Sequence, residues 1–306
     1  MRKILLICLI ALISAICASA QSQVEQNLSY EGFASVEVSE HFTVRLIASD
    51  RYAVRIKADE RIASHVVSYV KEGGLYIMLD KKSFSPDLKK RMRGKELLAA
   101  ALEAEVYAPT INSLTLNGKT VLVQSDTIRI ETFGLKLNDD ARIEKLNLKC
   151  AAADIALTKS AYANLNVSVT DKLSLMVGNN AEVIVNQTGG SEMFIDAAGS
   201  AQIRTTMDVP RLDLSAASSA DIICIGNAQT VNLKAAGTST VQAETLNVVE
   251  ASVEQAGPSK CYMNVSDKIQ VNLTGGAMMT FTQTPVLDIV RVVNSTLIKA
   301  NDPKRK

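Results

Sequence analysis

Apolar residues return at a nearly constant interval over most of the chain. The second apolar residue of each short apolar segment falls at intervals of 21, 20, 18, 20, 19, 19, 20 and 20 residues, at Leu116, Leu137, Leu157, Leu175, Ile195, Leu214, Leu233, Val253 and Leu273. A fixed period near 20 residues is typical of a solenoid, in which each repeat is one coil that buries its apolar face against its neighbours. The pattern therefore predicts about nine stacked coils.

Each coil contains two alternating apolar segments separated by small residues. In one repeat Met193 and Ile195 come first, small residues follow at 198–200, and Ile203 and Thr205 form the second pair. Alternation with a period of two predicts strands, and the small residues predict tight turns that stack on one another. The coils lack the leucine–asparagine consensus and the helical period of other repeat classes. The expected fold is all-β, a parallel β-helix that is right-handed because crossovers between parallel strands almost always are.

Residues 30–103 have a different pattern, which predicts a small β-rich N-terminal domain in front of a β-helix over residues 104–298. Aromatic and β-branched residues alternate with polar ones, as is typical of strands, in residues 33–38, 42–47, 52–57 and 75–79. Ile62, Val66 and Tyr69 have the spacing of one face of a short helix.

Residues 81–103 interrupt this domain with a basic insertion that also contains good helix formers. Its charges suggest a patch for anionic polysaccharides or lipid headgroups. The candidate binding residues are Lys89, Lys90, Arg91 and Arg93. The plainer interpretation is a solvated loop or short helix inserted between two strands.

Both ends of the chain carry segments that are not expected to belong to the fold. A basic start, an apolar run and the small residues at 18–20 match a cleaved secretory signal peptide over residues 1–20. Residues 21–29 are expected to form a short linker and residues 299–306 a basic tail. The chain is therefore expected to be exported to the cell surface, the extracellular medium or the periplasm.

The balance of charges argues against nucleic acid as a partner. Loss of Arg2 and Lys3 with the signal peptide leaves 31 basic residues (33 − 2) against 32 acidic ones, a net charge of −1. A nucleic-acid-binding protein would be expected to carry a basic excess. After residue 20 no stretch is apolar enough to predict a transmembrane helix, so an integral membrane protein is not expected. A glycan or a protein on a surface is the expected partner.

The residues that usually carry chemistry are sparse. Cys150, Cys224 and Cys261 remain after cleavage, an odd number without paired spacing, which predicts buried free thiols rather than a disulfide framework. The two histidines, His41 and His65, are 24 residues apart and do not predict a metal site. No nucleophile elbow, phosphate-binding loop or dinucleotide-binding glycine motif occurs. No cofactor is expected.

A polysaccharide lyase or glycoside hydrolase is the enzymatic alternative, since both need carboxylates on adjacent coils. Counted from the repeat markers, Glu144, Glu182 and Asp221 fall in one column at every second coil, which places neighbours roughly 10 Å apart at the usual strand spacing. Basic and aromatic partners and long loops that could grip a substrate are missing. A solvated polar face explains the column better, and the chain is not expected to be an enzyme.

The order of these parts resembles a family of secreted proteins, the auto-transporter adhesins with a head GIN domain. The motifs that carry the resemblance are Phe33-x-x-Val36-x-Val38, Phe42-x-Val44, Gly74-Leu75-x-Ile77, Pro109-x-Ile111-x-x-Leu114 and the recurring coils, over about residues 30–285. The resemblance implies a β-helix with a β-rich N-terminal part and a role in adhesion. It implies no functional residues. The basic insertion is a departure from the family pattern.

The sequence as a whole predicts a secreted or cell-envelope β-helical protein that acts in adhesion or surface recognition without catalysis. A periplasmic structural scaffold is the first alternative, and the polysaccharide-degrading enzyme is the second. Solenoid ends expose unpaired strand edges. The N-terminal domain could cover one end and residues 287–298 the other, and the sequence leaves homo-oligomerisation open.

Overall fold

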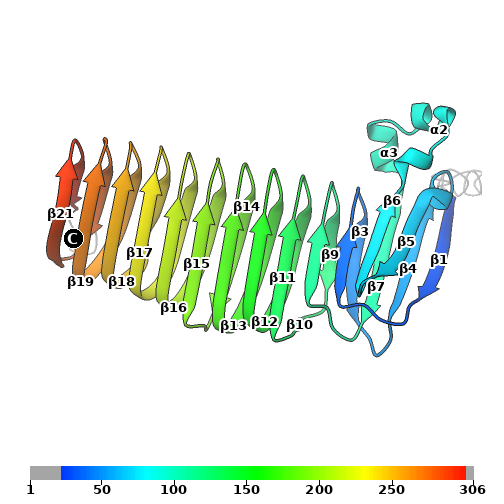
Figure 1. Ribbon diagram of the computed structural model, residues 1–306, viewed down its shortest axis with the longest axis horizontal. Helices are drawn as coiled ribbons and strands as arrows, with labels where there is room; N and C mark the ends of the chain where they lie inside the picture. Colours follow the sequence, from blue (N-terminus) through cyan, green and yellow to red (C-terminus); the bar gives the residue numbers. More distant parts are fainter. Residues whose placement is uncertain (1–21, 301–306) are drawn as a thin grey trace, which may run out of the picture.

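The computed structural model describes residues 22–300, which form one elongated stack of β-coils. Figure 1 shows the stack from the side, with β1 at one end, β21 at the other, and two short helices projecting from the N-terminal part. The signal peptide expected at residues 1–20 and residues 301–306 of the expected tail lie outside the described residues.

Short strands and turns make up the N-terminal part. In chain order these are β1 (Gln23–Ser29), β2 (Ser35–Val38), β3 (Thr43–Ala48), β4 (Ala53–Asp59), η1 (Ala63–His65), β5 (Val66–Lys71), β6 (Gly74–Leu79), η2 (Lys81–Ser83), α2 (Pro86–Arg91), α3 (Lys95–Ala99) and β7 (Leu102–Ala108). The four strands expected in this region are present as β2, β3, β4 and β6.

The strands that follow range from 2 to 17 residues, and the longest of them run from one coil into the next. These are β8 (Ser113–Leu116), β9 (Val121–Ser125), β10 (Ile128–Arg129), β11 (Thr132–Leu137), β12 (Arg142–Leu157), β13 (Tyr162–Val177), β14 (Glu182–Thr188), β15 (Glu192–Ala197), β16 (Gln202–Ala216), β17 (Asp221–Ala236), β18 (Thr240–Ala256), β19 (Lys260–Thr274), β20 (Met278–Thr282), β21 (Val286–Val293) and β22 (Thr296–Lys299).

Each coil has two strand segments joined by a tight turn. β15 forms one side of a coil, residues 198–201 form the turn, and the first part of β16 returns along the other side. β16 then continues past Pro210 into the next coil, where residues 211–216 pair in parallel with β15. The expected fold is confirmed as a parallel β-solenoid of about nine turns.

The repeat markers chosen from the sequence do not all lie in one column of the sheet. The markers at both ends of the series are displaced by two residues from the column of the central markers. Leu175, Ile195, Leu214, Leu233 and Val253 do pair in one continuous column. The first three markers and the last one lie in the neighbouring column, because Leu157 pairs with Val177 and Leu273 pairs with Gln255. Both columns point inward, so hydrophobicity alone cannot distinguish them.

Small residues fill the corner where the two sides of a coil meet. The last residue of the tight turn is an almost completely buried alanine in five successive coils, at Ala141, Ala161, Ala181, Ala201 and Ala220. Earlier in the same turn, Gly199 has φ +78°, and a Cβ atom there would lie 2.8 Å from the Asn179 backbone. The coils can stack at strand spacing only because the corner holds little side-chain volume.

This packing predicts the effect of enlarging one corner residue. Ala201→Leu should lower the free energy of unfolding by about 1–3 kcal/mol, because the added carbons have no space between the coils. Gln202→Leu is the matched control: Gln202 is the next residue, points outward and is exposed, so its effect should stay within about 0.5 kcal/mol. Denaturant unfolding measures both, and equal stability of the two variants would contradict the corner packing.

The strands of residues 30–103 pair directly with those of the solenoid. β2 lies between β6 and β8, and β3 lies between β7 and β9, all in parallel. The chain thus builds the β2–β3 coil first, adds the β6–β7 coil on one side of it, and continues with the β8–β9 coil on the other. Hydrogen bonding crosses the expected domain boundary at residues 103 and 104 without a break, and the division into two domains stays a prediction.

Two expectations for the N-terminal part are wrong. Residues 23–29 of the expected linker form β1, which pairs antiparallel with β4 along its whole length. β1 is largely polar and exposed, so only its backbone pairing defines it as a strand. The segment from Ile62 to Tyr69, expected as a helix, consists of η1 followed by β5, which pairs antiparallel with β6. Pairing with β6 outweighs the weak helical spacing.

The two ends of the solenoid differ. At the N-terminal end, β1, β4 and β5 add antiparallel strands, and Ile62 is fully buried beneath them. The Asp59 carboxylate there accepts hydrogen bonds from the backbone N, Nε and Nη2 of Arg61 at 3.0, 2.8 and 2.6 Å, which lowers the pKa of Asp59. At the C-terminal end, β21 and β22 stack on β19 and β20, and Leu297 packs against the core. The expected cap over residues 287–298 is therefore only partly correct: these residues cover the preceding coil, but the inward Leu287 is 42% exposed and the outer edge of β21 has no partner strand within residues 22–300.

Candidate functional site

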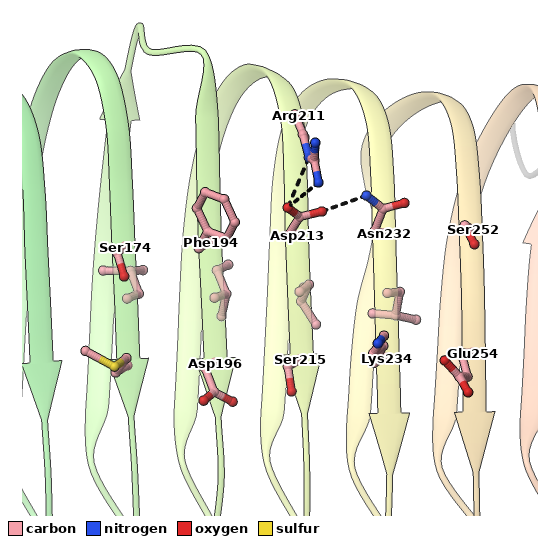
Figure 2. Close-up of a pocket in the computed structure, with 15 residues that line it drawn as sticks. Ser174, Phe194, Asp196, Arg211, Asp213, Ser215, Asn232, Lys234, Ser252 and Glu254 are labelled. Atoms are coloured by element: carbon pink, nitrogen blue, oxygen red, sulfur yellow. Dashed lines mark hydrogen bonds and ion pairs between the residues drawn. The ribbon is translucent and has the colours of Figure 1, made fainter.

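One outer face of the solenoid carries a groove of about 680 Å³, which we call the outer groove. It crosses β13, β15, β16, β17 and β18, whose parallel registers align their outward side chains into two rows (Figure 2). The first row consists of Ser174, Phe194, Asp213, Asn232 and Ser252. The second row consists of Met176, Asp196, Ser215, Lys234 and Glu254.

Phe194 gives the first row an apolar surface. It lies between the buried Met193 and Ile195 in sequence, so strand alternation points its ring outward, where it is half-buried. The Nζ atom of Lys172 lies 4.4 Å from the ring centroid, a cation–π contact. Met176, on the adjacent strand in the second row, is 50% exposed. The groove therefore has an apolar part beside its polar one.

A hydrogen-bonded network lies next to Phe194 in the groove. Arg211 donates from Nε to Oδ2 of Asp213 at 3.0 Å, and its Nη2 lies 2.9 Å from the same oxygen. Asn232 donates from Nδ2 to Oδ1 of Asp213 at 2.7 Å (Figure 2). The hydrogen bond that Arg211 donates to Asp213, together with the negative charge of Asp213, raises the pKa of the Arg211 guanidinium above its ordinary value. These hydrogen bonds orient the three polar side chains toward one another at the surface.

The charges that line the groove nearly cancel. Asp196, Asp213 and Glu254 supply three negative charges, and Arg211 and Lys234 supply two positive ones, which leaves −1 (2 − 3). A site of this balance does not favour a strongly charged ligand. Its carboxylates, amide, hydroxyls and cations offer both donors and acceptors.

The structure does not bring the sequence-predicted binding residues into this groove. Lys89, Lys90 and Arg91 lie on α2, and Arg93 follows it, all exposed on the insertion at the N-terminal part (Figure 1). An ion pair between Lys81 and Glu40 links the start of the insertion to the turn between β2 and β3. The helical conformation expected within the basic segment is present as α2 and α3. Whether these residues bind a ligand stays a prediction.

The expected carboxylate column is only partly correct. Glu182 pairs with Gln202, and Gln202 pairs with Asp221, so these three share one column as expected. Glu144 is not part of it, because Arg142 occupies the equivalent position two coils before Glu182. Glu144 is counted from the marker Leu137, which lies in the column next to that of Leu175, so the position counted from it is shifted by two residues. The column lies on the other strand segment of each coil, outside the outer groove.

The histidines and the remaining candidates for chemistry are dispersed. His65 shares a hydrogen bond of 2.6 Å with Ser83, and burial lowers the pKa of His41 in the turn between β2 and β3. Within residues 22–300 there is no cluster of three or more His, Cys, Asp and Glu side chains placed to hold a metal ion. In the same range no helix is long and apolar enough to cross a membrane.

The three cysteines within residues 22–300 are free and buried, as expected. Burial raises the pKa of the Cys150 thiol to about 11 and that of Cys224 to about 12, and it also raises the pKa of Cys261. Cys261 pairs with Val241 in the column of Ile222, whereas Cys224 lies two residues further along its strand. The two thiols therefore occupy different inward columns of the core.

This burial predicts that the thiols do not react in the folded protein. At pH 8 an alkylating reagent should leave Cys150, Cys224 and Cys261 unmodified, because thiolate is scarce at that pH and the sulfur atoms are covered. Under denaturing conditions all three should react. Peptide mass spectrometry distinguishes the sites, and rapid native labelling of any of them would contradict the placement of that residue in the core.

Sequence reasoning missed the outer groove because its residues are unremarkable one at a time. In the sequence Phe194 lies between two core residues and resembles a core residue itself. Only the alternation of the strand assigns it to the outer face. Asp213 and Asn232 are 19 residues apart and meet only through the register of β16 and β17. A search for aromatic residues at outward positions of the repeat would have identified Phe194.

A parallel β-solenoid with a polar and aromatic groove belongs to the class of proteins that present an extended, repetitive surface. Within that class, this chain belongs to the family described as "Putative auto-transporter adhesin, head GIN domain", whose model matches residues 32–191 and 163–285. The resemblance found in the sequence motifs is thereby confirmed. No protein of curated function matches the sequence.

Two solved structures similar to this chain come from species of Parabacteroides. A putative adhesin from Parabacteroides distasonis has a TM-score of 0.51 and 13% identity, with 92% of this chain and 98% of that one covered. A putative adhesin from Parabacteroides merdae has a TM-score of 0.49 and 10% identity, with coverage of 92% and 97%. At such low identity the first similarity supports the fold alone, and neither assigns a function to any residue.

Proposed function

We propose that this chain is an exported recognition protein that binds a neutral glycan along the outer groove without chemically changing it. The observation that carries the proposal is the half-buried Phe194 ring beside the hydrogen-bonded Arg211–Asp213–Asn232 network. The C–H groups on one face of a sugar ring pack well on the partly negative face of an aromatic ring. The hydroxyl groups of the sugar can donate hydrogen bonds to carboxylate and amide oxygens and accept them from amide and guanidinium N–H groups.

The repeat geometry supports a chain-like ligand. Equivalent outward positions recur at the strand spacing of roughly 4.8 Å across the coils that line the groove. A polymer lying across the strands would meet a polar side chain from each coil in turn. The small net charge of the lining favours a neutral polymer over a strongly anionic one.

Export to the cell surface is part of this proposal. It is supported by the signal peptide that the sequence predicts at residues 1–20 and by membership of a family described as adhesins. On an elongated protein at the cell surface, the outer groove would be accessible to glycans outside the cell.

Removal of the aromatic ring should weaken glycan binding. Phe194→Ala should raise the dissociation constant for a bound neutral oligosaccharide about 3- to 10-fold, because the stacking surface is lost. Asp213→Ala should also weaken binding, because it removes the acceptor that orders Arg211 and Asn232. The measurement is a screen of neutral oligosaccharides followed by calorimetric titration of each variant.

Tyr162→Ala is the matched control. Tyr162 is also half-buried and is also covered by a cation, since Arg142 lies 4.8 Å from its ring centroid, but it lies outside the groove. Its loss should leave binding unchanged. Equal effects of the two aromatic variants, or no neutral glycan bound at all, would contradict the proposal. New reducing ends released from the bound glycan would instead support the polysaccharide-degrading enzyme.

A second surface is proposed at the basic insertion for anionic polysaccharides, supported by the exposure of every basic side chain on α2. The combined variant Lys89→Glu/Lys90→Glu/Arg91→Glu should abolish salt-sensitive retention on a heparin column, because it reverses three neighbouring charges. Binding of neutral oligosaccharides in the outer groove should not change.

A triple reversal elsewhere controls for net charge. Lys136, Lys145 and Lys149 are exposed on the sheets, and their change to Glu alters the net charge by the same amount. This control should keep its retention on heparin. Retention that is lost to the same degree in both triple variants would rule out a specific basic surface.

A further inference from the structure

The last long strand of the solenoid is an exposed apolar edge. β21 pairs with β19 on one side only, and no strand within residues 22–300 pairs with its other side. Val286, Ile289 and Val290 are 66%, 55% and 60% exposed. A long exposed edge of β-branched residues is a template for another strand, and proteins ordinarily cover or interrupt such edges.

The inward positions of this strand are also exposed. Leu287, Ile289 and Val292 continue the core columns of β19, whose matching residues are fully buried. They occupy the position of core residues in a coil that no further described coil covers. At the N-terminal end, by contrast, the outer strands are the antiparallel β5 and the mostly polar β1.

A bulge at Val290 fixes which side chains point outward. Ile289 pairs with Val271 and Arg291 pairs with the next residue, Asn272, so Val290 is an extra residue in β21. Asp288 and Arg291 therefore both lie on the outer face, while Leu287 and Val292 both point inward. Without the extra residue, Leu287 and Val292 would lie on opposite faces.

This arrangement makes β21 complementary to itself. When two copies lie antiparallel with the two-fold axis between Ile289 and Val290, all eight residues of the strand are paired. Leu287 then faces the partner's Val292, with both side chains inward. Asp288 faces the partner's Arg291, with both side chains outward. Other two-fold registers pair fewer residues or set inward side chains against outward ones, because residues opposite each other in an antiparallel pair share a face.

Asp288 and Arg291 are both able to form this ion pair with a second copy. Asp288 accepts a hydrogen bond from Gln270 at 3.0 Å and lies 3.8 Å from Lys268, and both contacts use its Oδ2 atom. Arg291 is exposed and makes no ion pair within the described part of the chain. Two symmetric ion pairs would therefore form across the axis.

We propose that two copies of this chain associate through their C-terminal ends, with β21 pairing antiparallel to β21 of the second copy. The contact continues the sheet and covers the inward residues at the end of the core. It is an isologous contact with two-fold symmetry, so it closes at two copies and does not propagate into a fibre. The result is a rod of twice the length that carries two outer grooves.

Charge reversal tests the register directly. The wild-type chain should sediment as a dimer, and Arg291→Asp should raise the dimer dissociation constant on the order of tenfold or more, because it sets like charges opposite each other twice. Asp288→Arg should have the same effect. The double variant Asp288→Arg/Arg291→Asp restores opposite charges across the axis and should restore the dimer.

Arg204→Asp is the control, because Arg204 is exposed on a central coil and should not affect assembly. The unfolding midpoints of all variants report whether they fold. A monomer at every concentration, an assembly larger than a dimer, or a dimer unaffected by the single reversals would overturn the proposal. Failure of the double variant to recover would overturn the assigned register. None of these results depends on whether a glycan binds the outer groove.

Discussion

The structure depends on one constraint, the in-register stacking of each coil on the next at strand spacing. Backbone hydrogen bonds set that spacing at roughly 4.8 Å, and the buried alanines at the turn, such as Ala181 and Ala201, allow it at the corner. Inward positions must then be apolar and of limited size, while outward positions are almost free to vary. A surface for recognition can therefore be built on the outer rows without disturbing the core.

The same constraint explains why the ends of the rod matter. Each internal coil is covered on both sides, but the first and last coils are not. Antiparallel strands resolve this at the N-terminal end, where β1 and β5 lie outside the first coils. At the C-terminal end, the last coil has apolar residues at its inward positions like an internal coil, but Leu287 and Ile289 are exposed. Pairing of two copies at this end would cover these residues with a second coil.

The periodic part of the fold could be predicted from the sequence, because the coils repeat two strands and a small-residue turn. The exact register could not, since Leu157 and Val177 lie in the same inward column and both neighbouring columns are apolar. β1 escaped prediction because only its backbone pairing with β4 defines it. The outer groove also escaped, since Phe194 and Asp213 become neighbours only when that register is known. The basic residues of α2 were found from charge alone, which does not say what they bind.

The central claim is that this rod acts in recognition at the cell surface, and trypsin treatment of intact cells tests it most directly. The sheets should resist cleavage, whereas the exposed basic residues around α2 offer sites such as Lys89 and Arg91. The account predicts cleavage within residues 81–101 on intact cells, while a soluble periplasmic protein stays whole. If the chain stays whole until the envelope is opened, the recognition account is contradicted and a periplasmic scaffold takes its place.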